Sequence, residues 1–219
     1  MIDAVVFDLD GVVVDSEQVW DEVREQYARE RGGEYSASAT RDMMGMSAPE
    51  WSRYMAESLR VPGPPERIVA DVLERMLERY GDDPPLLPGA VDAVRRVGAR
   101  WPLAIASSSN PELIDVVLRT TGLASLVGVA VSSQEVAQGK PAPDVYLEAA
   151  RRLGVEPARA AAVEDSHNGI RSAKAAGMAV VAIPNTHFPP DAAALALADR
   201  VLETIDELTV ELLASLRIR

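Results

Sequence analysis

The stretch that most constrains this chain is the apolar run Ala4–Phe7, which is followed at once by Asp8-Leu9-Asp10-Gly11. A short run with β-branched residues is typical of a strand buried on both faces. Side chains alternate along a strand, so Asp8 and Asp10 should leave it on the same side, about 7 Å apart at Cα. Gly11 then permits a sharp exit. Because an unpaired buried charge is very costly, the two carboxylates should lie where a cation or solvent compensates their negative charge. A strand that simply ends in a polar turn would have the same pattern.

Composition limits the classes of partner. The 219 residues carry a net charge of −12, which argues against nucleic acid and anionic membranes as main partners. There is no cysteine, so disulfide and thiolate chemistry are excluded. The first residues lack the basic start of a signal peptide, and no apolar run approaches the roughly 18 residues of a membrane span. We therefore expect a cytoplasmic protein made of one large domain or of one domain with an insert.

The residues after Asp15 are charge-rich, and their apolar positions recur at helical spacing. This pattern predicts helices and no strand over the first part of the chain, at 16–31, 40–46, 48–59 and 65–80. A segment rich in proline and acidic residues, 82–89, is typical of a linker.

Beyond the linker, short apolar runs alternate with amphipathic stretches. We predict strands over 103–106, 127–131, 160–163 and 179–183, and a last short one over 199–202. Helices are predicted over 91–98, 111–120, 143–153, 169–176, 191–197 and 205–216. Such alternation is typical of an α/β fold with a doubly wound parallel sheet. The expected domains are an α/β core, 1–15 with 89–219, and an all-helical insert after the first strand, 16–88.

Polar side chains follow each of the main predicted strands, and ligands bind at the carboxyl ends of parallel strands. The groups at these ends are Asp8, Asp10 and Gly11; Ser107, Ser108, Ser109 and Asn110; Lys140; and Glu164 and Asp165. Asn110 is a good N-cap and Pro111 suits the first helical position, so an anion site is possible there, although a capped helix alone gives the same pattern.

Four carboxylates at one sheet edge would repel one another and raise one another's pKa values. A hard divalent cation with oxygen ligands relieves that repulsion, and Mg²⁺ commonly binds a few carboxylates together with substrate phosphate. A lone loop lysine is usually solvated, but Lys140 is held between Gly139 and Pro141 at this edge and is a better candidate for an anion. The combination predicts phosphoryl transfer, with a carboxylate attacking phosphorus.

Four short motifs in this order resemble those of the haloacid dehalogenase-like (HAD-like) hydrolase superfamily, in particular the β-phosphoglucomutase-like branch with a helical cap. They are Phe7-Asp8-Leu9-Asp10-Gly11-Val12, Ala106-Ser107-Ser108-Ser109, Gly139-Lys140-Pro141-Ala142-Pro143-Asp144 and Val163-Glu164-Asp165-Ser166. The resemblance covers essentially the whole chain and implies a Rossmann-like core. It also implies a small phosphate ester as the substrate, Mg²⁺ as the cofactor, and a monomer.

The resemblance further implies roles for single residues. Asp8 is expected to be the nucleophile that becomes an aspartyl-phosphate, and Asp10 the general acid and base. Ser107 is similar to the residue that donates to the phosphoryl oxygens, and Lys140 to the one that balances their charge. The remaining expected substrate-binding residues are Gly11, Ser108, Ser109 and Asn110.

The expected metal ligands are Asp8, Asp10 (through its backbone carbonyl) and Asp165. Glu164 is expected either to be a further ligand or to support the ligands. The helical insert is expected to close over the site as a cap.

The insert departs from the phosphomutases in its basic residues. Those enzymes carry a histidine where this chain has Trp20, and a lysine and an arginine around a glycine turn that here reads Met44-Gly45-Met46-Ser47-Ala48. A mutase must hold a second phosphate, so their absence favours a phosphatase of a monophosphate with an apolar cap pocket. A sugar phosphomutase remains the alternative.

Three other classes fit less well. Dehalogenases of the superfamily lack an acid at the position of Asp10, and response-regulator receivers are shorter and have no helical insert. A binding protein that has lost catalysis is disfavoured by the complete set of acids and lysine. The two histidines, His167 and His187, are expected to be rim or structural residues.

Overall fold

The computed structural model describes the chain except for residues 37, 44–45, 47, 187–188 and 217–219. It divides into two compact units, Met1–Asp15 with Pro84–Arg219, and Ser16–Asp83. Met44, Gly45, Ser47 and His187, to which the sequence drew attention, lie outside the described residues. None of the described helices is long and apolar enough to cross a bilayer.

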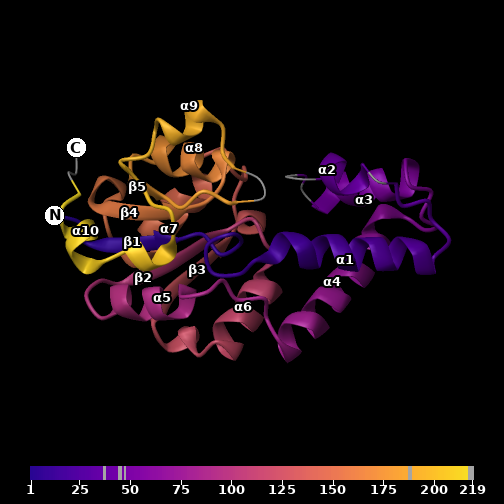
Figure 1. Cartoon of the computed structure of the whole chain (residues 1–219), viewed down its shortest axis with the longest axis horizontal. Helices are drawn as coiled ribbons and strands as arrows, with labels where there is room; N and C mark the ends of the chain where they lie inside the picture. Colours follow the sequence, from indigo (N-terminus) through magenta and orange to yellow (C-terminus); the bar gives the residue numbers. More distant parts are fainter. Residues whose placement is uncertain (37, 44–45, 47, 187–188, 217–219) are drawn as a thin grey trace. The chain divides into compact units, whose positions relative to one another are not determined.

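The larger unit is built on a parallel sheet with the strand order β3-β2-β1-β4-β5-β6 (Figure 1). The strands are β1 (Ala4–Phe7), β2 (Leu103–Ser107), β3 (Val127–Ser132), β4 (Ala160–Glu164), β5 (Ala179–Ala182) and β6 (Arg200–Val201). The predicted α/β class and doubly wound sheet are thereby confirmed. Phe7 at the end of β1 pairs with Ile105 on one side and Val163 on the other. The residues that follow β1, β2 and β4 therefore emerge next to one another.

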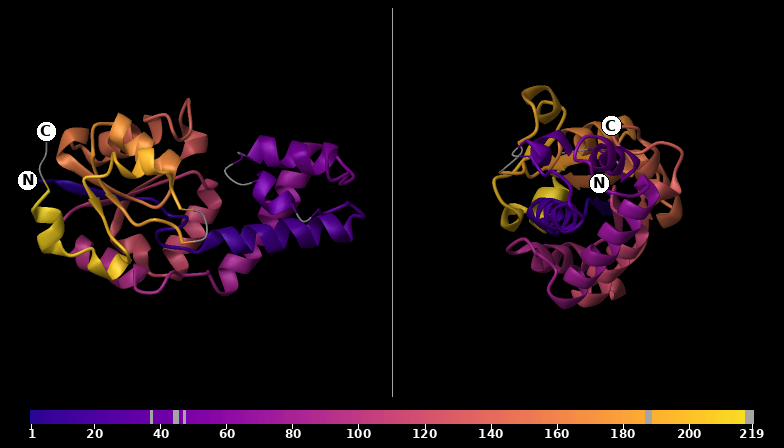
Figure 2. Two further views of the ribbon diagram at one scale, coloured as in Figure 1. Left: turned by 45° about the horizontal axis from the view of Figure 1, so that its top comes forward. Right: turned by 90° about the vertical axis from the view of Figure 1, so that its right-hand side faces the viewer.

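Helices cover both faces of this sheet (Figures 1 and 2). They are α5 (Ala90–Gly98), α6 (Pro111–Thr120), α7 (Asp144–Leu153), α8 (His167–Ala175), α9 (Ala192–Leu195) and α10 (Val210–Ala214). Short 3₁₀ turns lie at Leu123–Ser125, Ser133–Glu135, Pro157–Arg159 and Ile205–Glu207.

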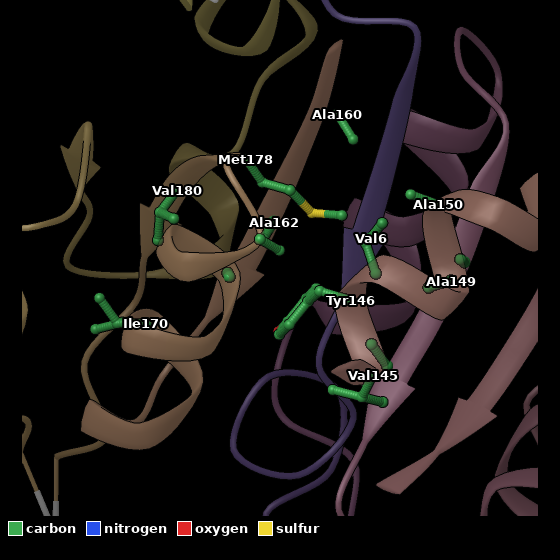
Figure 3. Close-up of a cluster of buried hydrophobic side chains, with 14 of the residues drawn as sticks. Val6, Val145, Tyr146, Ala149, Ala150, Ala160, Ala162, Ile170, Met178 and Val180 are labelled. Atoms are coloured by element: carbon green, nitrogen blue, oxygen red, sulfur yellow. The ribbon is translucent and has the colours of Figure 1, made fainter. Parts of the chain in front are cut away.

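The face under α7 and α8 is unusually rich in alanine. Figure 3 shows Val145, Tyr146 and Ala149 of α7 facing Val6 of β1, with Ala162 of β4 close by. All of these side chains are fully buried. Small residues let the helices approach the strands closely, and this brings the first turn of α7 to the carboxyl edge of the sheet.

The predicted C-terminal helix over 205–216 is wrong, because two caps divide the segment. Thr204 and Glu207 form a capping box around the turn Ile205–Glu207, and Thr209 then caps α10, its Oγ1 accepting from Leu212 N–H at 3.1 Å. Side-chain caps compete with continuing helix, so two short pieces replace one long one.

The smaller unit is helical throughout its described residues, as predicted. Its helices are α1 (Ser16–Glu30), α2 (Ala39–Met43), α3 (Ala48–Glu57) and α4 (Pro65–Asp82). The unit ends at Asp83, whereas we expected it to extend to 88. Two hydrogen bonds attach residues 84–88 to the larger unit: Asp15 N–H donates to Pro85 O at 2.7 Å, and Leu87 N–H donates to Val13 O at 3.0 Å.

Enlarging the alanine face should destabilise the larger unit. We expect Ala162→Leu to lower the free energy of unfolding by about 1–3 kcal/mol, because added methylenes in a filled core force neighbouring side chains apart. Ala192→Leu, at an exposed position of α9, should change it by less than about 0.5 kcal/mol. Urea denaturation of both variants measures the difference, and equal losses would contradict the packing argument.

Candidate active site

Asp8 follows β1 directly, and its backbone N–H donates to Val163 O at 2.9 Å. Its Oδ1 accepts from the Leu9 N–H at 2.7 Å, and its Oδ2 lies 2.8 Å from Lys140 Nζ. The residue is only 6% exposed. Burial raises the pKa of Asp8 well above its usual value, the Glu164 carboxylate raises it further, and the lysine opposes both effects.

Lys140 is the buried cation of the site. Its Nζ lies 2.8 Å from Asp8 Oδ2 and 2.7 Å from Glu164 Oε1, and its side chain is only 4% exposed. The ring of Tyr146 lies 5.2 Å from the same nitrogen. Burial lowers the pKa of Lys140, but the two carboxylates raise it by more, so the pKa is above its usual value and the lysine is charged. The structure thus places this lysine against two acids rather than in solvent.

Glu164, at the end of β4, is fully buried and accepts five hydrogen bonds. Its Oε1 accepts from Lys140 Nζ and from Tyr146 OH, both at 2.7 Å. Its Oε2 accepts from the Asp165 N–H at 3.1 Å, and from the N–H and hydroxyl of Ser166 at 3.3 and 3.2 Å. Burial raises the pKa of Glu164, but Lys140 and these donors lower it by more, so the carboxylate stays ionised.

Asp165 lies beside the turn that follows β1. A methyl group built on Gly11 would overlap the Asp165 carboxylate, and Gly11 has a φ of +75°. Both facts require glycine at that position. Asn185 Nδ2 donates to Asp165 Oδ2 at 3.4 Å. Burial, followed by the Glu164 carboxylate, raises the pKa of Asp165 to about 8.

Asp10 contacts the loop after β2 through one of its carboxylate oxygens. Its Oδ2 accepts from Ser107 Oγ at 3.0 Å and from Ser109 Oγ at 2.7 Å. Ser109 is held in turn, because Ser132 Oγ donates to its carbonyl at 2.6 Å. Asp10 Oδ1 is buried and has no hydrogen-bond partner among the described residues. One of the two carboxylate oxygens of Asp10, Oδ1, can therefore accept a hydrogen bond from a ligand or bind a cation.

The structure gives no close contact for two of the predicted substrate-binding side chains. Ser108 is exposed. Asn110 is the N-cap residue of α6, as predicted, but its side chain makes no capping hydrogen bond. His167 lies exposed at the start of α8. Sequence reasoning missed two residues that contact the site: Tyr146 of α7, which donates to Glu164, and Asn185 after β5, which donates to Asp165.

The carboxylates fit a divalent cation. Asp8, Glu164 and Asp165 each offer an oxygen within 4.8 Å of the others, and Lys140 is the one cation paired with any of them in the described part of the chain. The buried, unpartnered Oδ1 of Asp10 points to the same need for positive charge. Because Glu164 is already saturated with donors, Asp8 and Asp165 retain more capacity to bind a hard cation.

The structure is thus a doubly wound α/β protein with a candidate metal-binding group of acids at the carboxyl edge of its sheet. The sequence model of the haloacid dehalogenase-like hydrolases matches residues 2–177, and the chain belongs to that family. Hexitol phosphatase B of Escherichia coli (strain K12) is 31% identical over 95% of both chains. A probable pseudouridine-5'-phosphatase of Drosophila melanogaster is 32% identical over 82% of this chain and 80% of its own length.

A solved structure agrees with these sequence matches. CbbY from Rhodobacter sphaeroides, in complex with phosphate, has a TM-score of 0.83 at 28% identity and covers 95% of this chain and 96% of its own. The fold and the insert after the first strand are thus common to proteins of this family.

Replacing Gly11 should show how closely the first turn packs on Asp165. Gly11→Ala combines a left-handed backbone with an overlap against a buried carboxylate, so we expect a loss of more than about 2 kcal/mol in the free energy of unfolding. Gly32→Ala is the matched control, because Gly32 has a φ of +79° with open space around it. It should lose only about 1–2 kcal/mol. Equal losses in denaturant titrations would show that Asp165 imposes no constraint.

Proposed function

We propose that this protein is a Mg²⁺-dependent phosphatase that hydrolyses a small phosphorylated metabolite through an aspartyl-phosphate. The observation that carries the proposal is the ion-paired Lys140, which touches Asp8 and Glu164 beside a third buried acid at the sheet edge. The phosphatases among its relatives support the same chemistry.

Asp8 is the proposed nucleophile. Its Oδ1 is fixed by a backbone N–H, and its Oδ2 lies at the lysine. A carboxylate oxygen attacks phosphorus, the bond to the leaving oxygen breaks, and the substrate alcohol departs. Lys140 stays charged throughout, so it offsets the negative charge that gathers on the phosphoryl group. Water then attacks the acyl phosphate, which releases inorganic phosphate and restores Asp8.

Asp10 is the proposed general acid and base. It protonates the leaving oxygen in the first step and takes a proton from the attacking water in the second. Ser107 and Ser109 hold its Oδ2. A modest rotation frees the acid for the leaving group and frees both hydroxyls, which can then donate to phosphoryl oxygens. The remaining proposed substrate contacts come from Gly11 and the loop that contains Ser108 and Asn110.

Asp8 and Asp165, with the backbone carbonyl of Asp10, are the proposed ligands of Mg²⁺. When bound, the ion offsets carboxylate and phosphate charge and orients the phosphate. Glu164 was expected either to bind the metal or to support its ligands. The five hydrogen bonds that Glu164 accepts favour the supporting role, because through them Glu164 holds Lys140 and the backbone at Asp165.

The substrate class follows from the relatives and from the insert. We propose that residues 16–83 form the cap that selects the substrate. The phosphomutase alternative is weaker, because Met44 and Ala48 stand where those enzymes carry basic residues. The named phosphatases among the relatives also favour hydrolysis over transfer.

Removing the nucleophile should abolish hydrolysis. Asp8→Asn keeps the shape of the side chain but cannot form the acyl phosphate, so we expect phosphate release to fall by about 10³-fold or more. Asp115→Asn, on the exposed face of α6, is the matched control and should keep full activity. Phosphate release from sugar phosphates and nucleotides, with Mg²⁺ and with EDTA, measures both.

Two outcomes would contradict the proposal. Hydrolysis that survives in Asp8→Asn would exclude the nucleophilic role. Conversion of glucose 1-phosphate to glucose 6-phosphate with a bisphosphate primer, without net phosphate release, would identify a mutase.

Binding of Mg²⁺ should tighten as the pH rises. The pKa of Asp165 is raised to about 8 before the ion binds, so below that pH the ion must displace a proton. We expect affinity to rise by up to about tenfold per pH unit between pH 6.5 and 8 and then to level off. Calorimetry in buffers of different ionisation enthalpy measures both the affinity and the released protons. Binding that is independent of pH, without proton release, would contradict this assignment.

A further inference from the structure

The helical unit contains a buried cation that forms no ion pair with any acid among the described residues. Arg24 of α1 is 6% exposed, and it makes no ion pair within the described part of the chain. Its Nε donates to Trp20 O, one turn earlier, at 3.0 Å. It is the one buried arginine among the described side chains. A buried charge ordinarily needs a partner, so its isolation calls for an explanation.

Two indole rings frame this guanidinium. Arg24 Cζ lies 5.7 Å from the centroid of the Trp20 ring and 6.0 Å from that of Trp51. The two rings are 6.2 Å apart and tilted by 56°. Their faces attract the cation but accept no strong hydrogen bond, so they leave the donors on its two Nη atoms to another group.

The neighbouring acids do not neutralise Arg24. Asp21 accepts a hydrogen bond from Tyr35 OH at 2.6 Å and is engaged there. Burial lowers the pKa of Arg24 by more than Tyr35, Glu17 and Asp21 raise it. By contrast, Arg31 and Arg67 of the same unit both pair with Asp71 at 2.7 Å. Arg31 and Arg67 thus each have a directly paired acid, whereas among the described residues Arg24 has none.

We propose that Arg24, between Trp20 and Trp51, is an oxyanion-binding residue that selects phosphate esters with a second anionic group. A guanidinium presents parallel N–H donors that match a carboxylate or a phosphate, and aromatic walls strengthen such contacts by limiting water. In a chain with a net charge of −12, an anion has to be attracted locally. This inference rests on the proposed phosphatase function, and it adds a cation to the unit for which the sequence alone predicted an apolar pocket.

Paired substrates test the selection. 3-Phosphoglycerate differs from glycerol 3-phosphate by a carboxylate in place of a hydroxymethyl group, and fructose 1,6-bisphosphate adds a phosphate to fructose 6-phosphate. We expect kcat/KM to favour the more anionic member of one pair by at least about tenfold. The pair that shows the preference identifies the oxyanion as a carboxylate or a phosphate.

Variants at Arg24 test whether this residue causes the preference for the more anionic ester. In Arg24→Gln the two members should differ by less than about twofold, because the more anionic ester loses the contact that distinguishes it. Arg24→Lys should keep part of the preference, because it keeps the charge but loses the fork. Arg29→Gln, on the exposed side of α1 and paired with Glu25, removes the same charge and should keep the whole preference. An absent preference, or equal loss on both esters in Arg24→Gln, would overturn the proposal.

Fluorescence separates this proposal from the proposed function. Trp101, in the larger unit, is the third of the three tryptophans. In Trp101→Phe the emission comes from Trp20 and Trp51 alone, so the more anionic ester of the preferred pair should shift it and the less anionic one should not. Adding Arg24→Gln should abolish that shift. If the more anionic ester of a pair shifts the emission, its less anionic partner does not, and no ester is hydrolysed, the oxyanion site stands and the phosphatase assignment fails. If esters are hydrolysed but none shifts the emission, the oxyanion site fails.

Discussion

The contact on which the site depends is the double ion pair of Lys140 with Asp8 and Glu164. Three buried carboxylates near one another would otherwise hold their protons, because burial and mutual repulsion both raise carboxyl pKa values. The single lysine helps to hold the pKa of Glu164 below its usual value, whereas the pKa values of Asp8 and Asp165 stay raised. The remaining deficit of positive charge fits the proposal that a divalent cation binds here together with a phosphate group.

The fold brings these polar groups together because backbone segments pack closely against one another, and not because long side chains reach across a gap. Alanines of β2, Ala104 and Ala106, belong to the buried cluster on which α7 packs, and this packing sets Tyr146 OH on Glu164. Gly11 in its left-handed conformation lets the turn after β1 pass next to the Asp165 carboxylate. Small residues thus position the larger polar ones, so the acids are ordered by the sheet itself and lose little conformational entropy when they act.

The sequence predicted what depends on local pattern. Strands and helices followed from apolar spacing, and the order of polar groups followed from strand ends in a parallel sheet. It did not predict Tyr146 on Glu164 or Ser109 on Asp10, because those contacts join residues 18 and 99 positions apart. Helical spacing also extended over 205–216, where capping side chains at Thr204 and Thr209 divide the segment. The spacing of apolar residues does not reveal where a capping side chain ends one helix and begins another.

Lys140 and Arg24, both buried, differ in how many charged partners each has among the described residues. Lys140 has carboxylates on two sides, and its charge is largely used in holding them. Arg24 has aromatic faces and one backbone carbonyl, and it forms no ion pair with any described acid, although Glu17 and Asp21 act on it from farther away. A buried cation that already has ion-pair partners mainly holds those partners in place. A buried cation without them gains most free energy from a ligand that supplies the missing anionic acceptor. The same reasoning favours the supporting role proposed for Glu164, and it fits the proposal that Asp8 and Asp165, which accept fewer hydrogen bonds, bind the metal ion.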